Sequence, residues 1–189
     1  MVEKLLVKPN ATHLEGYKKA LATGWSPNNL RPEAAAEELV RATSQPKVML
    51  AEMDDPMALG PAIVLPDGRK VDRLPSVRRF IWDRGFCGVI SLRWPKDQGA
   101  LPDHVSGHIG YAVIPTERGR GLATQALAEL LPIARKVGLD HVDLTADPDN
   151  IASCRVIEKN DGKALSRKDL PKVLGGGKSV LYRIQLTAG

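Results

Sequence analysis

The segment Arg118-Gly119-Arg120-Gly121-Leu122-Ala123 constrains this chain most, because a strand pattern precedes it and a helix pattern follows it. Residues 107–115 form a short apolar run closed by Pro115. Residues 123–137 carry apolar side chains at helical spacing among good helix formers. A turn through glycines into a helix places unpaired backbone N–H groups and the positive end of a helix dipole together. The sequence therefore predicts an anion site, best suited to phosphate.

The side chains of this loop fit the same interpretation. Glycines at 119 and 121 let the backbone approach an anion closely. Arg118 and Arg120 are expected to add positive charge. A second block follows: residues 141–146 alternate as a strand, and Asn150 and Ser153 open a helix pattern that ends at Gly162.

The two blocks together resemble the GNAT superfamily of acetyltransferases across residues 107–162, through Arg-x-x-Gly-x-Ala at 118–123 and Asn-x-x-Ser at 150–153. The Asn-x-x-Ser spacing and the Glu-Lys-Asn run at 158–160 are most similar to the branch that acetylates ribosomal-protein N-termini. The resemblance implies an α/β GNAT fold, with a mixed, mainly antiparallel sheet of about six to seven strands flanked by helices. It implies acetyl-CoA as co-substrate and no metal.

The resemblance also implies where the acetyl-CoA donor lies. In the family the motif strand parts from its neighbour at a bulge, and backbone groups there pair with pantetheine and face the thioester oxygen. Here those groups belong to Val113 and Ile114, while Asn150 holds the pantetheine arm. The residues expected to bind acetyl-CoA are Val113, Ile114, Arg118, Gly119, Arg120, Gly121, Leu122, Ala123, Thr124 and Asn150.

Two residues are candidates for proton transfer. An amine acceptor with a reference pKa near 10.4 needs a base or a water relay. His108, just upstream of the bulge, is the expected base; its alternative is a hydrogen-bonded structural histidine at a strand start. Many relatives have a Glu there. The family's usual proton donor, a Tyr, is replaced by Ile157. Ser153 is the expected substitute acid, and its alternative is a residue that satisfies free N–H groups of the first helical turn.

Composition limits the other classes of function. The 189 residues suit one domain spanning 1–189, and 43% hydrophobic with 26% charged residues is ordinary for a globular protein. Two cysteines without metal spacing, and no signal-like or membrane-length apolar run, favour a cytoplasmic location with free thiols. The net charge of +5 is scattered and aromatics are 4%, so neither nucleic acid nor a membrane is expected as partner. A homodimer is left open.

The N-terminal part is expected to contain two helices. The first strand is expected over residues 3–7. Thr12, with Glu15 three residues later, predicts a capping box for a helix to about Ala22. A second helix is expected from Leu30-Arg31-Pro32 to about Thr43, and residues 45–53 are expected to be irregular.

The remaining elements are predicted to be strands. Residues 54–77, rich in proline and turn pairs, are interpreted as an insertion with a hairpin around Asp67-Gly68. Residues 78–81 and 86–94 are expected to form two strands joined by a turn. Two more strands are expected at 163–167 and 179–186.

These observations predict an N-acetyltransferase in which an amine, either a small molecule or a peptide, attacks acetyl-CoA directly. One rival is a non-catalytic acyl-CoA-binding module that kept the loop; the missing helix Tyr favours it. A second rival is a basic nucleic-acid-binding domain. Tyr111 and Trp94 are candidates for the acceptor pocket, with a place in the core as the alternative.

Overall fold

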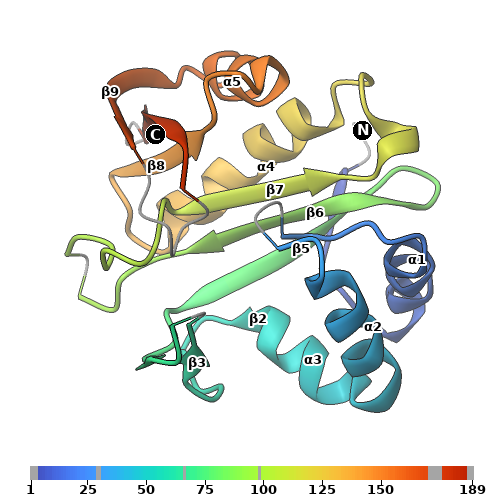
Figure 1. The fold of residues 1–189 in the computed structure, drawn as a ribbon. Coiled ribbons are helices and arrows are strands. Elements are labelled where there is room, and N and C mark those ends of the chain that lie inside the picture. The colour runs from blue at the N-terminus through green and yellow to red at the C-terminus, as the bar shows by residue number, and fades with distance from the viewer. Residues whose placement is uncertain (1–3, 29–30, 66, 98, 170–175, 187–189) are drawn as a thin grey trace.

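The computed structural model describes residues 4–28, 31–65, 67–97, 99–169 and 176–186, and it has the predicted mixed α/β GNAT architecture (Figure 1). Helices α1 to α3 cover one face of the large sheet, and α4 covers the other (Figure 1). The helices are α1 (Ala11–Ala22), α2 (Ala34–Ser44), α3 (Pro46–Met53), α4 (Leu122–Lys136) and α5 (Ile151–Glu158). The strands are β1 (Leu6–Val7), β2 (Asp54–Asp55), β3 (Ile63–Val64), β4 (Lys70–Val71), β5 (Ser76–Trp82), β6 (Phe86–Arg93), β7 (Ile109–Val113), β8 (His141–Ala146), β9 (Lys163–Asp169) and β10 (Lys178–Gln185).

The strands fall into two main sheets rather than one. The larger has the order β1-β5-β6-β7, with β2 added to β5, and the smaller has the order β8-β10-β9. Every ladder between described strands is antiparallel. The division falls between β7 and β8, the two strands that flank the motif loop and α4.

Side chains on the two faces of the large sheet pack into two separate hydrophobic cores. Ile81, Ile90 and Ile109 pack toward α4 and β8. Phe80, Val89 and other residues on the opposite face pack against α1 to α3. The period of two along each strand therefore separates the two faces cleanly.

The first helices differ in detail from the sequence prediction. The N-cap of α1 is Asn10, not Thr12: Asn10 is extended, and its Oδ1 accepts a hydrogen bond from the His13 N–H at 3.0 Å. Helix α2 begins at Ala34, two residues after Pro32, whereas Leu30 and Glu3 lie outside the described residues.

Residues 46–53 form helix α3, so the prediction of an irregular passage there was wrong. Pro46 occupies its first turn, where proline needs no N–H partner. Met49 and Met53, four residues apart, are both buried. That i,i+4 spacing was the overlooked signal.

The proline-rich segment contains the expected hairpin. Strands β3 and β4 pair around Asp67-Gly68, where Gly68 has φ +83°. The ends of the segment belong to the large sheet, because β2 pairs with the start of β5 through Asp54↔Val77. The hairpin therefore projects from the sheet beside α3 (Figure 1).

Candidate active site

A gap between β7 and β8 is the centre of the site. At its base the two strands touch: the His108 N–H donates to the Asp143 carbonyl at 2.7 Å. Beyond that contact, β7 pairs with β6 and β8 pairs with β10, and among the described strands no ladder joins β7 to β8. The strands therefore part at the place where the GNAT resemblance expects the donor.

The backbone N–H of Val113 in β7 faces this gap, whereas the N–H of Ile114 does not. The Ile114 N–H donates to the Cys87 carbonyl at 2.9 Å, so the sheet already uses it. The ladder to β6 runs without a register shift, so it lacks the expected bulge. Because the antiparallel ladder alternates, the Val113 N–H points away from β6. The predicted contact of Ile114 with the donor would therefore use a group other than its N–H.

The motif loop places open N–H groups at the start of α4, at the end of the molecule where β7 finishes (Figure 1). Gly119 and Gly121 have φ of +76° and +78°, a region that favours glycine. The first helical bond is from the Gln125 N–H to the Gly121 carbonyl. Within the described chain, three first-turn N–H groups have no hydrogen-bond partner: Leu122, Ala123 and Thr124. This geometry is an anion cradle.

The two loop arginines differ. Arg118 is exposed, and its Nε donates to the Val113 carbonyl at 3.1 Å, which ties the loop to the end of β7. Arg120 forms ion pairs with Glu117 and Asp83. These ion pairs balance the charge of Arg120, whose contact with the donor stays a prediction.

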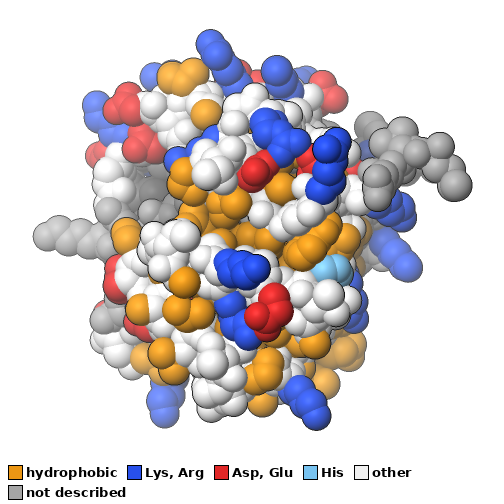
Figure 2. Space-filling model, turned by 90° about the vertical axis from the view of Figure 1, so that its right-hand side faces the viewer, with side chains coloured by type: hydrophobic (Ala, Val, Ile, Leu, Met, Phe, Trp, Pro, Cys, Tyr) orange, Lys and Arg blue, Asp and Glu red, His pale blue; other side chains and the backbone are white. Residues whose placement is uncertain are grey.

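The surface at this end of the molecule suits a ligand with both apolar and phosphate parts. Figure 2 shows hydrophobic side chains across the middle of this face, with Lys and Arg side chains among and around them and a few Asp and Glu side chains beside these. A pantetheine arm with a phosphorylated nucleotide has the same mixed character.

Asn150 caps α5 with the oxygen of its side-chain amide, and the cap does not use the NH2 group. Its Oδ1 accepts a hydrogen bond from the Ser153 N–H at 3.1 Å. Asn150 is exposed, and its Nδ2 has no partner among the residues that the structure describes. The capping role and a contact with pantetheine are therefore compatible.

Ser153 and Tyr111 connect α5 to β7. The two hydroxyl groups are 2.8 Å apart, and the Tyr111 hydroxyl also lies 3.2 Å from the Ser153 carbonyl. Burial raises the pKa of Tyr111 to about 12, so its hydroxyl keeps its proton at neutral pH. Ile157, which stands at the family's Tyr position, is buried in the core. Trp94 is a core residue as well.

His108 is buried at the base of the gap, and its Nδ1 accepts a hydrogen bond from the Asp143 N–H at 2.9 Å. Burial lowers the pKa of His108 despite the nearby Asp143 carboxylate. The lone pair that a base would use is therefore occupied, and the ring is neutral with its proton on Nε2. This geometry favours the structural alternative over general-base catalysis.

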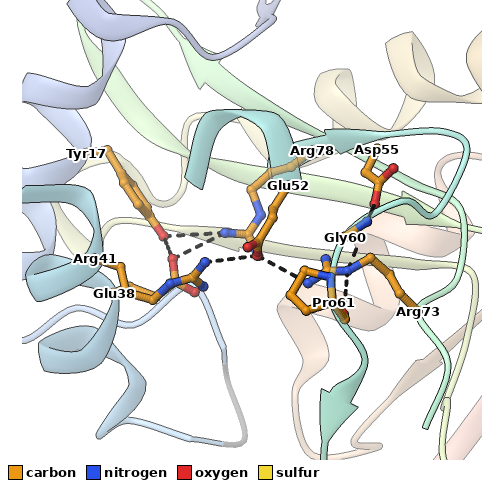
Figure 3. Close-up of polar contacts among 9 residues, drawn as sticks. All are labelled: Tyr17, Glu38, Arg41, Glu52, Asp55, Gly60, Pro61, Arg73 and Arg78. Carbon is orange, nitrogen blue, oxygen red and sulfur yellow. Dashed lines mark hydrogen bonds and ion pairs between the residues drawn. The ribbon is translucent and has the colours of Figure 1, made fainter. Parts of the chain in front are cut away.

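A second hollow, of about 660 Å³, lies on the opposite face of the large sheet, between α2, α3, the β3–β4 hairpin and strands β5 and β6. Charged side chains form a network across it (Figure 3). Glu52 accepts from Arg41 at 2.9 Å and from Arg73 at 3.1 Å. Glu38 accepts from Arg78 at 3.3 Å and from the Tyr17 hydroxyl. We call this hollow the acceptor cleft, after the role proposed for it below.

Sequence analysis missed the acceptor cleft, because its charges come from distant parts of the chain. Arg78 and Glu38 are 40 residues apart, and Arg73 and Glu52 are 21 apart. The described residues contain no group of three or more His, Cys, Asp or Glu that could hold a metal ion. Among the described helices, none is long and apolar enough to cross a membrane.

The family model for the GNAT acetyltransferase domain matches residues 18–163. The chain belongs to the GNAT acetyltransferase family. The acyltransferase class and the acetyl-CoA co-substrate expected from the sequence are thereby confirmed at family level. No curated protein matches.

Solved structures share this fold at low identity. RimL, a ribosomal L7/L12 α-N-protein acetyltransferase in complex with coenzyme A, has a TM-score of 0.63 at 16% identity, covering 96% of this chain and 93% of that one. RimJ of Mycobacterium smegmatis, bound to a CoA disulfide, has 0.63 at 21%, covering 95% and 80%. The microcin C7 self-immunity acetyltransferase MccE, with acetyl-CoA and AMP, has 0.56 at 12%, covering 95% and 91%.

Proposed function

We propose that this GNAT acetyltransferase transfers the acetyl group of acetyl-CoA to a primary amine by direct attack in a ternary complex. The observation that carries the proposal is the open first turn of α4, next to the gap between β7 and β8. The cradle takes the pyrophosphate, and the arm enters the gap beside Val113 and the Asn150 amide. The amine then reaches the thioester carbon from the acceptor cleft.

In this proposal, the oxyanion is stabilised by backbone rather than by a side chain. The Val113 N–H, turned away from β6, is the proposed donor to the thioester oxygen. Preorganised donors of this kind contribute roughly 3–4 kcal/mol to transition-state stabilisation. The amine loses its proton to water, since the lone pair of His108 is engaged.

The proton for the departing thiolate is assigned to the Tyr111–Ser153 pair. The two hydroxyl oxygens bridge β7 and α5 at 2.8 Å. One hydroxyl passes a proton to the sulfur, the other replaces that proton, and water then returns one proton to the pair. A thiol has a reference pKa of about 8.5 and is a tolerable leaving group, so we expect this help to be modest. Ser153→Ala and Tyr111→Phe should each slow thiol release by about tenfold or less, with a larger loss for thiols of higher pKa. Equal losses for all thiols would contradict the assignment.

The similar structures support one class of acceptor, and the size of the cleft allows another. RimL is an α-N-protein acetyltransferase, which supports a peptide α-amine as acceptor. A small-molecule amine is equally compatible with an open cleft of this size. The proposal includes one catalytic domain over residues 1–189, a cytoplasmic location, and neither nucleic acid nor a membrane as partner. The buried free thiols of Cys87 and Cys154 are consistent with a reducing compartment. A homodimer stays a prediction, tested by sedimentation.

The test is thiol release from acetyl-CoA over a panel of peptides with free N-termini, amino acids, polyamines and aminoglycosides. Acetyl-CoA should also raise the melting temperature, because a ligand that binds only the folded state stabilises it. A melting shift without release for any amine would favour the rival, a non-catalytic acyl-CoA-binding module. No shift at millimolar acetyl-CoA would contradict donor binding itself.

A further inference from the structure

Arg93 is the arginine of the acceptor cleft whose charge is not balanced. Its side chain is partly buried at the end of β6, and its guanidinium makes no hydrogen bond or ion pair with any residue that the structure describes. Burial and the nearby charge of Arg78 both lower the pKa of Arg93, which shows that its surroundings disfavour the cation. A partly buried guanidinium without a counter-charge favours an anionic ligand.

The carboxylates nearby do not supply that anion. Glu38 is engaged by Arg78 and the Tyr17 hydroxyl. Glu52 accepts hydrogen bonds from two other arginines of the cleft (Figure 3). Asp72 also lines the cleft, but it is exposed. A third carboxylate, Asp55, lies 4.0 Å from the Arg73 Nε. Three carboxylates therefore face the three other arginines of the cleft, and Arg93 has no such partner among the described residues.

The position of Arg93 places a bound anion close to the site of acetyl transfer. The Arg93 N–H donates to the His108 carbonyl at 2.9 Å, at the base of the gap. The Arg93 Nη2 lies 3.2 Å from the point where a side chain on Gly110 would begin, so the guanidinium lies over β7. Gly110 leaves this space open, on the face of the sheet that carries the cleft.

Resting on the proposed function, we propose that the acceptor is an amine that also carries an anionic group, a carboxylate or a phosphate, and that Arg93 binds this group. A guanidinium binds either anion through paired N–H donors. The cleft volume of about 660 Å³ lies within the range of small-molecule sites, so the anion and the amine belong to one compact molecule or to the first residues of a peptide.

The experiment compares acceptors that differ only in charge, with acetyl-CoA as donor. The pairs are 2-aminoethyl phosphate with ethanolamine, β-alanine with β-alaninamide, and Ala-Asp amide with Ala-Asn amide. They separate a phosphate, a free carboxylate and an acidic peptide side chain as the source of the anion. In at least one pair, kcat/KM for thiol release should be about tenfold or more higher for the anionic member.

Arg93→Gln should bring that ratio close to one, and Arg93→Lys should retain part of it. The matched control is Arg135→Gln, which removes an exposed arginine at the end of α4 and should keep the full ratio. With CoA present to fill the motif loop, inorganic phosphate should raise the melting temperature of the parent but not of Arg93→Gln.

The outcomes separate the two proposals. Release with every pair at a ratio near one would overturn the anionic acceptor and leave the acetyltransferase proposal standing. A preference that survives Arg93→Gln would overturn the assignment to Arg93. Absence of release for every amine, with acetyl-CoA still bound, would overturn the proposed function and the inference with it.

Discussion

The donor side and the acceptor side of this enzyme are built in opposite ways. On the donor side, the loop before α4 and the cap of α5 leave backbone N–H and amide groups open to a ligand. On the acceptor side, Glu52 and its arginines fill the cleft with interlocking ion pairs. In the proposed function, backbone groups therefore hold the donor, and charged side chains select the acceptor.

This difference suits the two ligands. The pyrophosphate of acetyl-CoA can be bound by the open N–H groups at the start of a helix, without charged side chains. The acceptor varies, and selection among amines needs charges in fixed positions. Substitutions can separate the two sides, because donor binding and acceptor preference are measured independently.

The largest effect is expected for Gly121→Val. Gly121 has φ +78° at the start of α4, so a β-branched residue there is strained, and its side chain blocks approach to the open N–H groups. The melting shift caused by acetyl-CoA should disappear. Differential scanning fluorimetry with and without acetyl-CoA measures it.

Gly24→Val is the matched control for Gly121→Val. Gly24, just after α1, has φ +83° and also has no atom within 4 Å of an added Cβ. Both variants should lose roughly 1–2 kcal/mol of folding free energy through backbone strain. Only Gly121→Val should lose the acetyl-CoA shift. If Gly24→Val lost the acetyl-CoA melting shift to the same extent, the loss could not be assigned to the loop before α4.

The sequence predicted the donor side well because its signals are local. Gly119, Gly121 and the pattern of α4 lie within a few residues, and they fix φ, the helix start and the open N–H groups together. The ion pair of Arg120 with Asp83 joins residues that are 37 positions apart, and it could not be predicted. The same holds for the hydrogen bond between the Ile114 N–H and the Cys87 carbonyl, which depends on strand pairing.

The acceptor side could not be predicted from the sequence, for a related reason. Arg93 reads in the sequence as the ordinary polar residue of an alternating strand. Its place over Gly110 requires the pairing of β6 with β7, and the lack of a partner requires knowledge of every neighbouring carboxylate. An unbalanced charge is a property of the whole fold and has no motif.

An intermediate effect is expected for Asn150→Ala. The change removes the cap of α5, at about 1 kcal/mol of stability, and the amide proposed to hold pantetheine. Asn10→Ala removes an equivalent cap from α1, where Oδ1 accepts from the His13 N–H. Both should lose similar stability in urea unfolding. Only Asn150→Ala should weaken acetyl-CoA binding, by about tenfold; equal affinities would make Asn150 a cap alone.

The smallest effect on acetyl-CoA binding and on acceptor preference is expected for substitutions of His108, which lies between the donor side and the acceptor side. Because burial holds the pKa of His108 below its usual value, the unfolded chain takes up a proton near pH 6.5 that the folded protein does not. Unfolding is then favoured as pH falls, and the free energy of unfolding should decrease between about pH 7 and pH 5.

His108→Asn tests this account against general-base catalysis. The Asn Oδ1 can replace Nδ1 as acceptor for the Asp143 N–H but takes up no proton in this range. Urea unfolding should therefore show a shallower decrease in stability below pH 7 than in the parent, by at most about 1.4 kcal/mol per pH unit. His108→Ala leaves the Asp143 N–H unpaired and should cost about 1–3 kcal/mol at any pH.

The rate of acetyl transfer in His108→Asn should keep the pH profile of the parent. If instead its rise near pH 6.5 vanishes while the fold stays intact, His108 is the base, and the amine is deprotonated from the base of the gap.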